Sequence, residues 1–427
     1  MISPRSINRT LKRTFSLYSK PVRFSPSQSA SPIPQHELVD EEASPAYNPK
    51  YFYPAKPGEM IANNYQLLPE RFVALKIINN RSSLDSYHEC HIEEHISQQT
   101  PTHRGRGIIR TCLDSFEVTG PDGNHLCLAY EPLREPRWIL QNRFVDQKLP
   151  LSIAKAYLLI LLAGLDYLHS ECRLVHTDLK LDNILMTFEN EDILPDFVKE
   201  QTTILPMQYK TDPTSGRTIY RCHNDFGRLD WKELRNMLPQ IVDFGLATQL
   251  QGDSQVGFHP IQPDHYRAPE VILGGPWSFS ADIWNIGVLA WNIIEHTDLF
   301  LQVHDSQGHY NPKTHLAEMI ALLGPPPKEI LAKCDAMADF SWSNPIVNET
   351  GRVCKNGREY FNGPFFNENG EFLHDDLIPA RKLQDSVPSL EENERKAFLS
   401  FVTCLLAWNP EDRQTAGELM EHPFLND

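Results

Sequence analysis

The stretch that most restricts the fold of this chain is HTDLKLDNIL, His176 to Leu185, which directly follows an apolar run with helical spacing over 151–172. Asp178 can accept a hydroxyl proton, Lys180 can offset the charge of a transferring phosphoryl group, and Asn183 can hold a metal ion. An ordinary polar turn has no reason to carry these three side chains at these spacings. The motif therefore predicts a loop with phosphoryl-transfer chemistry, placed at the end of a buried helix.

A second motif, IVDFGLA, spans Ile241 to Ala247. Its first two residues predict a buried strand that delivers Asp243 to a turn, and Gly245 permits that turn. The carboxylate of Asp243 is then placed to bind Mg²⁺. A competing Asp-Phe-Gly lies at Asp225 to Gly227, but the polar residues before it offer no strand to position its carboxylate. We therefore assign the metal ligand to Asp243.

Three further residues predict architecture rather than chemistry. RAPEVIL, Arg267 to Leu273, begins about 20 residues after the second motif, a workable length for an activation segment. Glu270 within it would be a buried carboxylate in need of a cation, and Arg413 is its expected partner. Asp282 is expected at a helix N-terminus, where a carboxylate can cap backbone N–H groups.

VALK, Val73 to Lys76, ends in the lysine expected to contact the α- and β-phosphates of a nucleotide. A helical glutamate should follow it in the chain and form an ion pair with it. The candidates are Glu89, Glu93 and Glu94. We favour Glu89, because Ile92 and Ile96 then form the packed helical face behind it.

Composition limits the function classes. The 427 residues carry a net charge of −16, which argues against a general nucleic-acid binder and is compatible with basic protein substrates. The longest apolar run, 155–166, is too short to span a bilayer. The eight cysteines form no CxxC pair and are expected to be reduced thiols, with neither a zinc site nor a disulfide framework.

The first 35 residues carry six basic side chains and no acidic one. Ile7, Leu11 and Phe15 would share one helical face, as in a mitochondrial transit peptide. A disordered basic tail is the alternative, and we favour it because Pro4 and Pro21 bracket the helix closely.

Strands are expected over 71–78 and 125–133, and helices over 84–98, 151–172, 281–294, 315–323, 392–406 and 416–421. The region 188–239 is polar, lacks a clear period and is expected to be an insertion. The segment 344–383 is rich in Gly, Asn and Pro and is expected to be irregular. We therefore divide the chain into a tail over 1–50, a small mixed lobe over 51–133, and a helical lobe over 134–427 that contains the insertion.

With these motifs in place, the chain resembles the eukaryotic protein kinase superfamily from about Arg71 to Leu425. More narrowly it is similar to the SR-protein kinases, especially fungal ones. The similarity rests on His-Thr-Asp at 176–178, GPDGNHLCLAYEPL, the insertion before DFGLA, and HLAEMIALLGPPP. It implies an α+β, two-lobed kinase fold, with a small mixed lobe and a large, mainly helical lobe.

The resemblance also implies ATP and Mg²⁺ as cofactors and phosphoryl transfer to Ser or Thr. Asp178, Lys180 and Asn183 would be catalytic, with Asn183 and Asp243 as the metal ligands. The cofactor-binding residues it implies are Lys76, Glu89, Ala74, Glu131, Leu133 and Asp243. Tyr130 would be the gatekeeper, and the backbone of Glu131 and Leu133 would meet the adenine.

Two departures from the family pattern bear on regulation and substrate. Thr177 replaces the arginine that commonly reads activation-loop phosphorylation, so this chain should not depend on that switch. Relatives tend to carry acidic residues where Lys313 and Thr314 stand, which weakens the expectation of an acidic docking groove for Arg-Ser repeats. Asp305 and Glu318 keep a basic substrate plausible.

A third departure is larger. Between Tyr65 and Val73 the chain has no room for the glycine-rich loop and its two flanking strands, so roughly 15–20 residues are absent. Backbone N–H groups of that loop would cradle the phosphates and exclude water. The small lobe is therefore expected to be truncated. A gene model without one exon, a pseudokinase scaffold and a slow but real kinase all remain open, and we favour the first.

The resulting expectation is an ATP-dependent serine/threonine kinase that acts on serine in basic, Arg-Ser-rich proteins linked to mRNA splicing. The alternative is a scaffold without activity. We expect a monomer with protein substrates such as splicing factors, with no direct nucleic-acid or membrane partner. The expected location is the cytoplasm and nucleus, or the mitochondrion if the N-terminal stretch is a transit peptide.

Overall fold

The computed structural model describes residues 32–43, 47–56, 59, 61, 72–81, 87–136, 149–203, 208–214, 216–221, 226–227, 229, 231–250 and 256–426. The two predictions for the basic N-terminal stretch fall almost entirely outside these residues. So does the absence of the glycine-rich loop, because 62–71 are not among them. The chain divides into two compact units, which are described separately.

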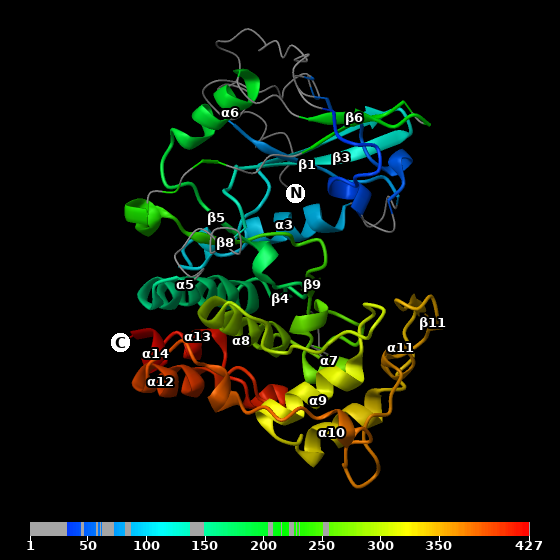
Figure 1. Cartoon of the computed structure of the whole chain (residues 1–427), viewed down its shortest axis with the longest axis vertical. Coiled ribbons are helices and arrows are strands. Elements are labelled where there is room, and N and C mark those ends of the chain that lie inside the picture. The colour runs from blue at the N-terminus through cyan, green and yellow to red at the C-terminus, as the bar shows by residue number, and fades with distance from the viewer. Residues whose placement is uncertain are drawn as a thin grey trace. The chain divides into compact units, whose positions relative to one another are not determined.

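Unit 1 comprises Met1–Tyr87, Cys112–Pro132 and Phe188–Asp230. Its antiparallel sheet has the strand order β1-β3-β2, with β1 at Ala74–Ile77, β2 at Asp114–Gly120 and β3 at Gly123–Tyr130 (Figure 1). The hairpin turns tightly, since Gly120 pairs with Gly123 and Gly123 adopts a φ of 137°. The central strand β3 is buried from His125 to Tyr130, which confirms the second predicted strand, and β1 confirms the first.

The rest of unit 1 comes from the two ends of its sequence range. The insertion forms a helix and a β-hairpin, α6 at Ile193–Thr203, β6 at Tyr209–Thr211 and β7 at Thr218–Tyr220. The N-terminal segment contributes two 3₁₀ turns, η1 at Asp40–Ala43 and η2 at Pro49–Tyr51. The insertion is thus more regular than its polar, aperiodic sequence predicts.

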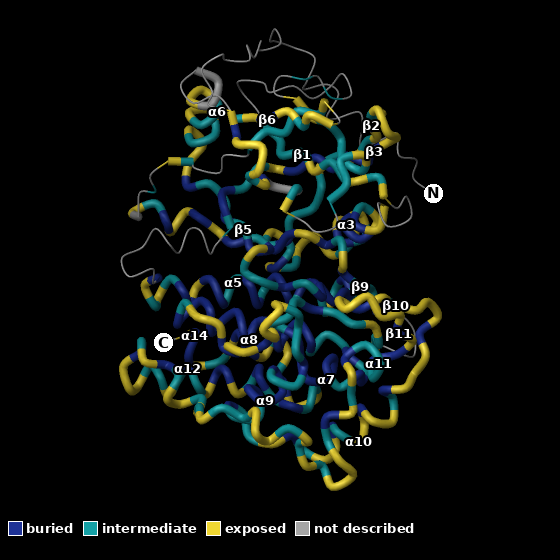
Figure 2. Tube along the Cα trace, turned by 45° about the vertical axis from the view of Figure 1, so that its right-hand side comes forward, coloured by how far each residue is buried: buried dark blue, intermediate teal, exposed yellow. Residues whose placement is uncertain are grey.

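Unit 2 comprises His88–Thr111, Leu133–Thr187 and Trp231–Asp427. Its core is built around α5 at Leu151–Ser170 and α8 at Ser280–Glu295, whose residues from Ala281 onward are all buried (Figures 1 and 2). The helices α12 at Glu392–Thr403, α13 at Ala416–Leu419 and α14 at Pro423–Asn426 complete this layer. Their aromatic side chains, Phe398, Phe401 and Phe424, are fully buried.

Among the described residues, α5 is the one helix long and apolar enough to cross a membrane by length and composition. We expected no membrane-spanning run because the apolar stretch 155–166 is too short to cross a bilayer. The helix α5 extends beyond that stretch at both ends. The inward residues of α5, such as Leu158, Leu161 and Leu165, have no exposed surface and belong to the hydrophobic core of unit 2.

Short elements of unit 2 position the loops that carry the motifs. The paired strands are β4 at Leu174–Val175 with β9 at Thr248–Gln249, and β5 at Ile184–Met186 with β8 at Pro239–Ile241. The other elements of this part are helices and single turns: α3 at His88–Gln98, η3 at Arg106–Ile108, η5 at Leu181–Asn183, η6 at Trp231–Asn236, η7 at Asp264–Tyr266 and α7 at Pro269–Ile272.

In the C-terminal part of unit 2, helices alternate with irregular segments. Its elements are α9 at Pro312–Leu323, α10 at Lys328–Met337, β10 at Ile346–Val347, β11 at Val353–Cys354, α11 at Gly357–Phe361, η8 at Asp375–Leu377, η9 at Leu383–Ser386 and η10 at Pro410–Asp412. The expectation of an irregular segment over 344–383 holds apart from the short hairpin, one helical turn and a 3₁₀ turn.

The predicted domain boundaries differ from the two units. The helix α3, which we assigned to the small lobe, lies in unit 2, and residues 188–230 of the insertion lie in unit 1 rather than in the helical lobe. Sequence order does not reveal either exchange, because the chain goes back to unit 1 after α3, at 112–132, and again at 188–230.

Candidate active site

The loop that carries HTDLKLDNIL is held by one buried carboxylate, that of Asp282. Its Oδ2 accepts the backbone N–H of His176 (2.7 Å) and its Oδ1 accepts that of Thr177 (3.1 Å). His169, near the end of α5, lies 3.0 Å from the same Oδ2. We predicted that Asp282 would cap backbone N–H groups of a helix, but the amides that it caps belong to this loop. Asp282 is a positioning residue that ties α8 to the loop.

Thr177 holds an uncommon backbone conformation. Its φ is 66°, a left-handed value that is costly for a β-branched residue. Two bonds fix it there: the N–H bond to Asp282, and the bond that its Oγ1 donates to the carbonyl of Leu246 (2.8 Å). The threonine therefore connects the loop directly to the residues that follow Asp-Phe-Gly.

His176 is fully buried and links the same two motifs. Its Nε2 lies 3.0 Å from the carbonyl of Val242, and its Nδ1 lies 3.3 Å from the N–H of Asp178. A carbonyl only accepts and an amide only donates, so this geometry fits the tautomer protonated at Nε2. Its ring packs against Phe244, with centroids 5.1 Å apart.

The three predicted catalytic residues come together in unit 2. Lys180 Nζ lies 3.1 Å and 3.2 Å from the two carboxylate oxygens of Asp178. Asn183 donates from its Nδ2 to the backbone oxygen of Asp178 (2.8 Å) and to its Oδ2 (2.9 Å). Asp178 is thereby fixed between a cation and an amide, with 16% of its side chain exposed.

Pairing of β5 with β8 brings the second motif to this place. Ile184 lies opposite Ile241, and the N–H of Val242 donates to the carbonyl of Asn183 (3.1 Å). Asp243 follows at once, exposed and with a φ of 67°. Asn183 and Asp243, predicted as metal ligands, are therefore neighbours in space although they are 60 residues apart in sequence.

The donor set at these two residues fits Mg²⁺. Because Asn183 Nδ2 is committed to Asp178, Oδ1 is the amide atom that can bind a metal, and Asp243 supplies a carboxylate. These are hard oxygen ligands of the kind Mg²⁺ takes, usually with waters and substrate phosphates completing the shell. The described residues contain no group of three or more His, Cys, Asp or Glu that could hold a metal ion by itself.

The nucleotide-binding predictions are divided between the units. Lys76 lies on β1 opposite Leu128, Ala74 opposite Tyr130, and Glu131 follows β3, all in unit 1. Glu89 and Leu133 belong to unit 2. The pairing of Lys76 with Glu89, and the contacts with nucleotide, stay predictions.

The helical face predicted behind Glu89 is present, because Ile92 and Ile96 are both buried. A Cβ built on Gly245 would lie 3.5 Å from Asp243 Oδ1 and 3.8 Å from Glu89 Oε2, so the carboxylate of Glu89 lies beside the Asp-Phe-Gly turn. Glu93, one helical turn on, is buried as well.

The competing Asp-Phe-Gly has a different environment. Asp225 lies outside the described residues, but Phe226 contacts Phe188 and Phe197 in an aromatic cluster of the insertion, with centroids 5.1 Å and 4.7 Å apart. It belongs to unit 1, whereas Phe244 is buried against the catalytic loop in unit 2. The choice of the second motif is consistent with this difference.

The expected buried ion pair of Glu270 is present. Both Glu270 oxygens accept a bond from Arg413, each at 2.7 Å, and the two side chains are 1% and 0% exposed. The guanidinium also lies over the ring of Trp284, 5.0 Å from its centroid. The pair therefore joins α7 to the start of α8 and the C-terminal turns.

Sequence reasoning missed a second buried anchor in the activation segment, Gln262. Its φ is 72°, its Nε2 donates to the carbonyl of Ala281 (2.9 Å) and to Asn285 Oδ1 (2.7 Å), and its Oε1 accepts the N–H of Ala268 (2.8 Å). Arg267 donates to its carbonyl. No periodicity or motif marks this glutamine, because its role arises from contacts that are distant in sequence.

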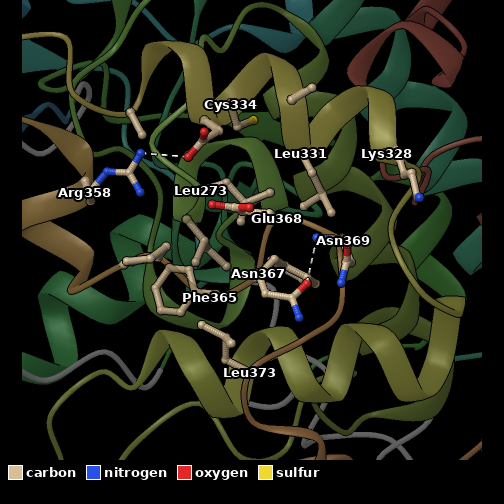
Figure 3. A pocket seen from close by; sticks show the side chains of 18 residues that line it. Leu273, Lys328, Leu331, Cys334, Arg358, Phe365, Asn367, Glu368, Asn369 and Leu373 are labelled. Carbon is tan, nitrogen blue, oxygen red and sulfur yellow. Dashed lines mark hydrogen bonds and ion pairs between the residues drawn. The ribbon is translucent and has the colours of Figure 1, made fainter.

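One cavity of unit 2, of about 480 Å³, is bordered by Thr177, by activation-segment residues within 246–250 and 256–262, and by Trp277, so it adjoins the catalytic loop. Another, of about 720 Å³, lies between α10 and the segment 363–373 and contains none of the predicted site residues (Figure 3). The larger cavity is thus not where the motifs converge.

The cysteines that the structure describes form no disulfide with one another. Burial raises the pKa of Cys172 to about 11 and that of Cys334 to about 12, so both thiols stay protonated at neutral pH.

Comparison with known proteins finds relatives over most of the chain. The protein kinase domain family matches residues 62–200 and 231–425 and leaves out the part of the insertion between them. A serine/threonine protein kinase of Aspergillus fumigatus is 33% identical over 434 residues, covering 97% of this chain and 98% of its own. The serine/threonine-protein kinase SRPK of Physarum polycephalum is 26% identical over 426 residues, covering 91% and 92%.

A crystal structure of a kinase domain matches with a TM-score of 0.56, at 21% identity, over 87% of this chain and 98% of that chain. At this identity the similarity shows the fold alone. The fold expected from the motifs is thereby confirmed.

Proposed function

Because the chain belongs to the protein kinase family, we propose that it uses Mg·ATP to phosphorylate serine in basic proteins, with Arg-Ser-rich splicing factors as the substrate class. The premise is that the chain belongs to this family and that relatives matching nearly its full length are named serine/threonine kinases. The cofactors and the substrate class are the proposal. A scaffold without activity receives no support from relatives that are named as kinases.

The observation that carries the proposal is that Lys180 and Asn183 both contact the carboxylate of Asp178. A serine hydroxyl that approaches Asp178 would pass its proton to the carboxylate as the oxygen attacks the γ-phosphorus, and ADP would leave. Lys180, 3.1 Å from that carboxylate, would offset negative charge on the transferring group. Asn183 and Asp243 would hold Mg²⁺, which supplies charge neutralisation for the phosphates when bound.

A basic substrate suits the acidic side chains of unit 2. Asp298 and Asp305 have 51% and 41% of their side chains exposed. Backbone N–H groups of His309 and Gln307 lower the pKa of Asp305, which keeps it ionised. Glu318, which we also expected near the substrate, is buried and paired with Arg381, so it is not part of this surface.

The test is Mg·ATP binding and phosphorylation of an Arg-Ser peptide by this chain, beside Asp178→Asn and a matched peptide with lysine in place of arginine. We expect ATP to bind both proteins and Asp178→Asn to lower kcat by about 100-fold or more. Equal rates on the two peptides would support a basic substrate without the Arg-Ser preference. ATP binding without transfer to either peptide would contradict the proposed substrate, and no ATP binding would contradict the kinase function of this chain.

A further inference from the structure

Two parts of unit 1 that carry no catalytic motif are joined by polar contacts. They are the N-terminal segment, described over 33–43 and 47–53, and the β6–β7 hairpin of the insertion, more than 150 residues away in sequence. At one end the N–H of Ile33 donates to the carbonyl of Tyr209 (3.1 Å). Gln35 donates to the carbonyl of Thr211 (3.2 Å), so the segment lies along β6.

A buried lysine holds the middle of this segment. Lys210 on β6 is 4% exposed and lies 2.7 Å from Glu42 Oε2. The same lysine donates to the carbonyl of Glu37, and Glu42 Oε2 also accepts the N–H of Val39 (3.1 Å). A buried cation is tolerated only when it is paired and hydrogen-bonded, so this site requires an acidic partner.

Two arginines hold the segment on either side of that lysine. Arg221 forms an ion pair with Glu37. Arg217 donates to the backbone carbonyls of Pro49, Phe52 (2.7 Å) and Tyr53 (3.2 Å), around the end of η2. The flat guanidinium fork suits several carbonyls at once, and a cation is favoured at the C-terminal end of a helical turn.

The far end of the segment reaches the three-stranded sheet of the same unit. The N–H of Asn80, just after β1, donates to the carbonyl of Tyr51 (3.0 Å). The ring of Tyr53 packs edge-on against His125 of β3, with centroids 5.7 Å apart. Burial, together with the bond that Tyr53 donates to Glu59, raises its pKa to about 12.

We propose that the β6–β7 hairpin is a binding surface for an acidic segment, and that its occupant is this chain's own N-terminal segment, described over 33–43 and 47–53. The hairpin supplies Lys210, Arg217 and Arg221, and the segment supplies Glu37, Glu42 and a cluster of carbonyls. Ile33 and Val39 are buried, as in a bound ligand. The insertion thereby ties the N-terminal segment to the sheet that carries Lys76, a role separate from the proposed substrate class.

Hydrogen–deuterium exchange on the full chain tests this proposal. Lys210→Glu places a carboxylate against Glu42 and is expected to speed amide exchange in 32–43 by about 100-fold, as expected for breaking a buried pair. Glu42→Lys is expected to speed exchange in 208–221, the opposite side of the contact. Lys50→Glu is the matched control, because Lys50 lies on the same segment, is exposed and has no ion pair among the described residues.

The double variant Glu42→Lys/Lys210→Glu restores opposite charges and is expected to recover part of the protection in both segments. Recovery should be partial, since the swapped side chains cannot remake the bonds to Glu37 and Val39. Lys210→Met removes the charge while keeping the length of the side chain, and is expected to speed exchange in 32–43 with the amides of α5 unchanged.

Unchanged exchange of 32–43 in both Lys210 variants would overturn the proposal. So would equal effects of Lys50→Glu and Lys210→Glu, or a double variant no better protected than the worse single variant. A synthetic peptide of residues 32–56 added to Glu42→Lys, in which the hairpin keeps Lys210, gives a further readout. Restored protection of 208–221 at high peptide concentration would support the hairpin as the binding surface.

Discussion

At the scale of single residues, the site depends on a few buried polar groups whose partners are far away in sequence. Asp282 accepts two loop amides, Gln262 joins the activation segment to α8, and Arg413 neutralises Glu270. Each such group is costly when its partner is removed, because the remaining atom stays buried without compensation.

Arg413→Ala should lower the free energy of unfolding by about 3–5 kcal/mol, because it leaves the Glu270 carboxylate buried without its cation. Urea unfolding followed by tryptophan fluorescence measures the change. Arg413→Lys keeps the charge but cannot make both 2.7 Å bonds, so its loss should be intermediate. A loss below about 1 kcal/mol for the alanine variant would contradict the structural role of the pair.

The contacts of Thr177 lead us to expect that kcat does not depend on phosphorylation of the activation segment. Its bonds to Asp282 and Leu246 join the two motifs without a phosphate, so treatment with a phosphatase should leave kcat unchanged. Thr177→Ala removes the bond to Leu246 and should cost about 1 kcal/mol of stability, with a lower kcat. Radiolabelled ATP assays before and after phosphatase decide this, and a drop in kcat on dephosphorylation would count against the interpretation.

At the scale of elements, sequence patterns located most of what is regular. The helices at 151–170, 280–295 and 312–323 and the strands at 74–77 and 123–130 agree with expectation within a few residues, because burial gives them strong periodicity. The helix expected from 84 begins at His88. The β6–β7 hairpin was missed, because its strands are three residues long and Lys210, a charged residue, points inward.

The candidate site was predictable in part for the same reason. Asp178, Lys180, Asn183 and Asp243 stand within short motifs whose spacing is itself the signal. The partners of Asp282 and the role of Gln262 are contacts between segments, and one sequence does not reveal which segments meet. The sequence therefore predicted correctly that Asp282 caps backbone N–H groups, but those groups belong to the loop and not to a helix.

Close packing in the activation segment gives a prediction at this scale. Gly257 pairs with Trp277, and a Cβ on it would lie 2.1 Å from the indole ring. Gly257→Ala should therefore push the segment away from Trp277, at a cost of about 1–3 kcal/mol. Gly107→Ala is the control, since nothing lies within 4 Å of a Cβ there. Thermal unfolding compares the two variants. Equal melting temperatures would show that the activation segment can move away from Trp277 without a loss of stability.

At the scale of the whole molecule, neither unit is continuous in sequence. Each unit is built from three separate sequence segments. The loss of one segment therefore removes contacts from a unit whose other segments lie elsewhere in the sequence. The family match itself breaks between 200 and 231, within the insertion that unit 1 contains.

Stability of the whole chain should fall in mild acid because of His315. This side chain is fully buried, and burial, with the nearby Arg267, holds its pKa well below the usual value, so the folded protein keeps it neutral. The unfolded chain binds a proton there once the pH drops below about 6.5, so each further unit should cost up to about 1.4 kcal/mol. This stability is fully present above pH 6.5 and is lost below it.

Urea midpoints at pH 7.5, 6.5 and 5.5 measure this dependence. His315→Gln cannot take up the proton and should flatten the curve between pH 6.5 and 5.5, whatever its effect at pH 7.5. His309→Gln, at an exposed histidine, is the control and should leave the slope as in the unchanged chain. The same slope in His315→Gln as in the unchanged chain would mean that other groups dominate.

The carboxylate of Asp282 has a consequence for the speed of the reaction. Because it already holds the amides of His176 and Thr177, the dipoles and side chains of the loop do not have to rotate when charge develops on a transferring group. In water, solvent molecules must reorient at that moment, and this reorganisation is much of the barrier. The fold therefore orients the loop once, through Asp282 of α8. The same side chains without a fixed structure would have to be oriented again at every turnover.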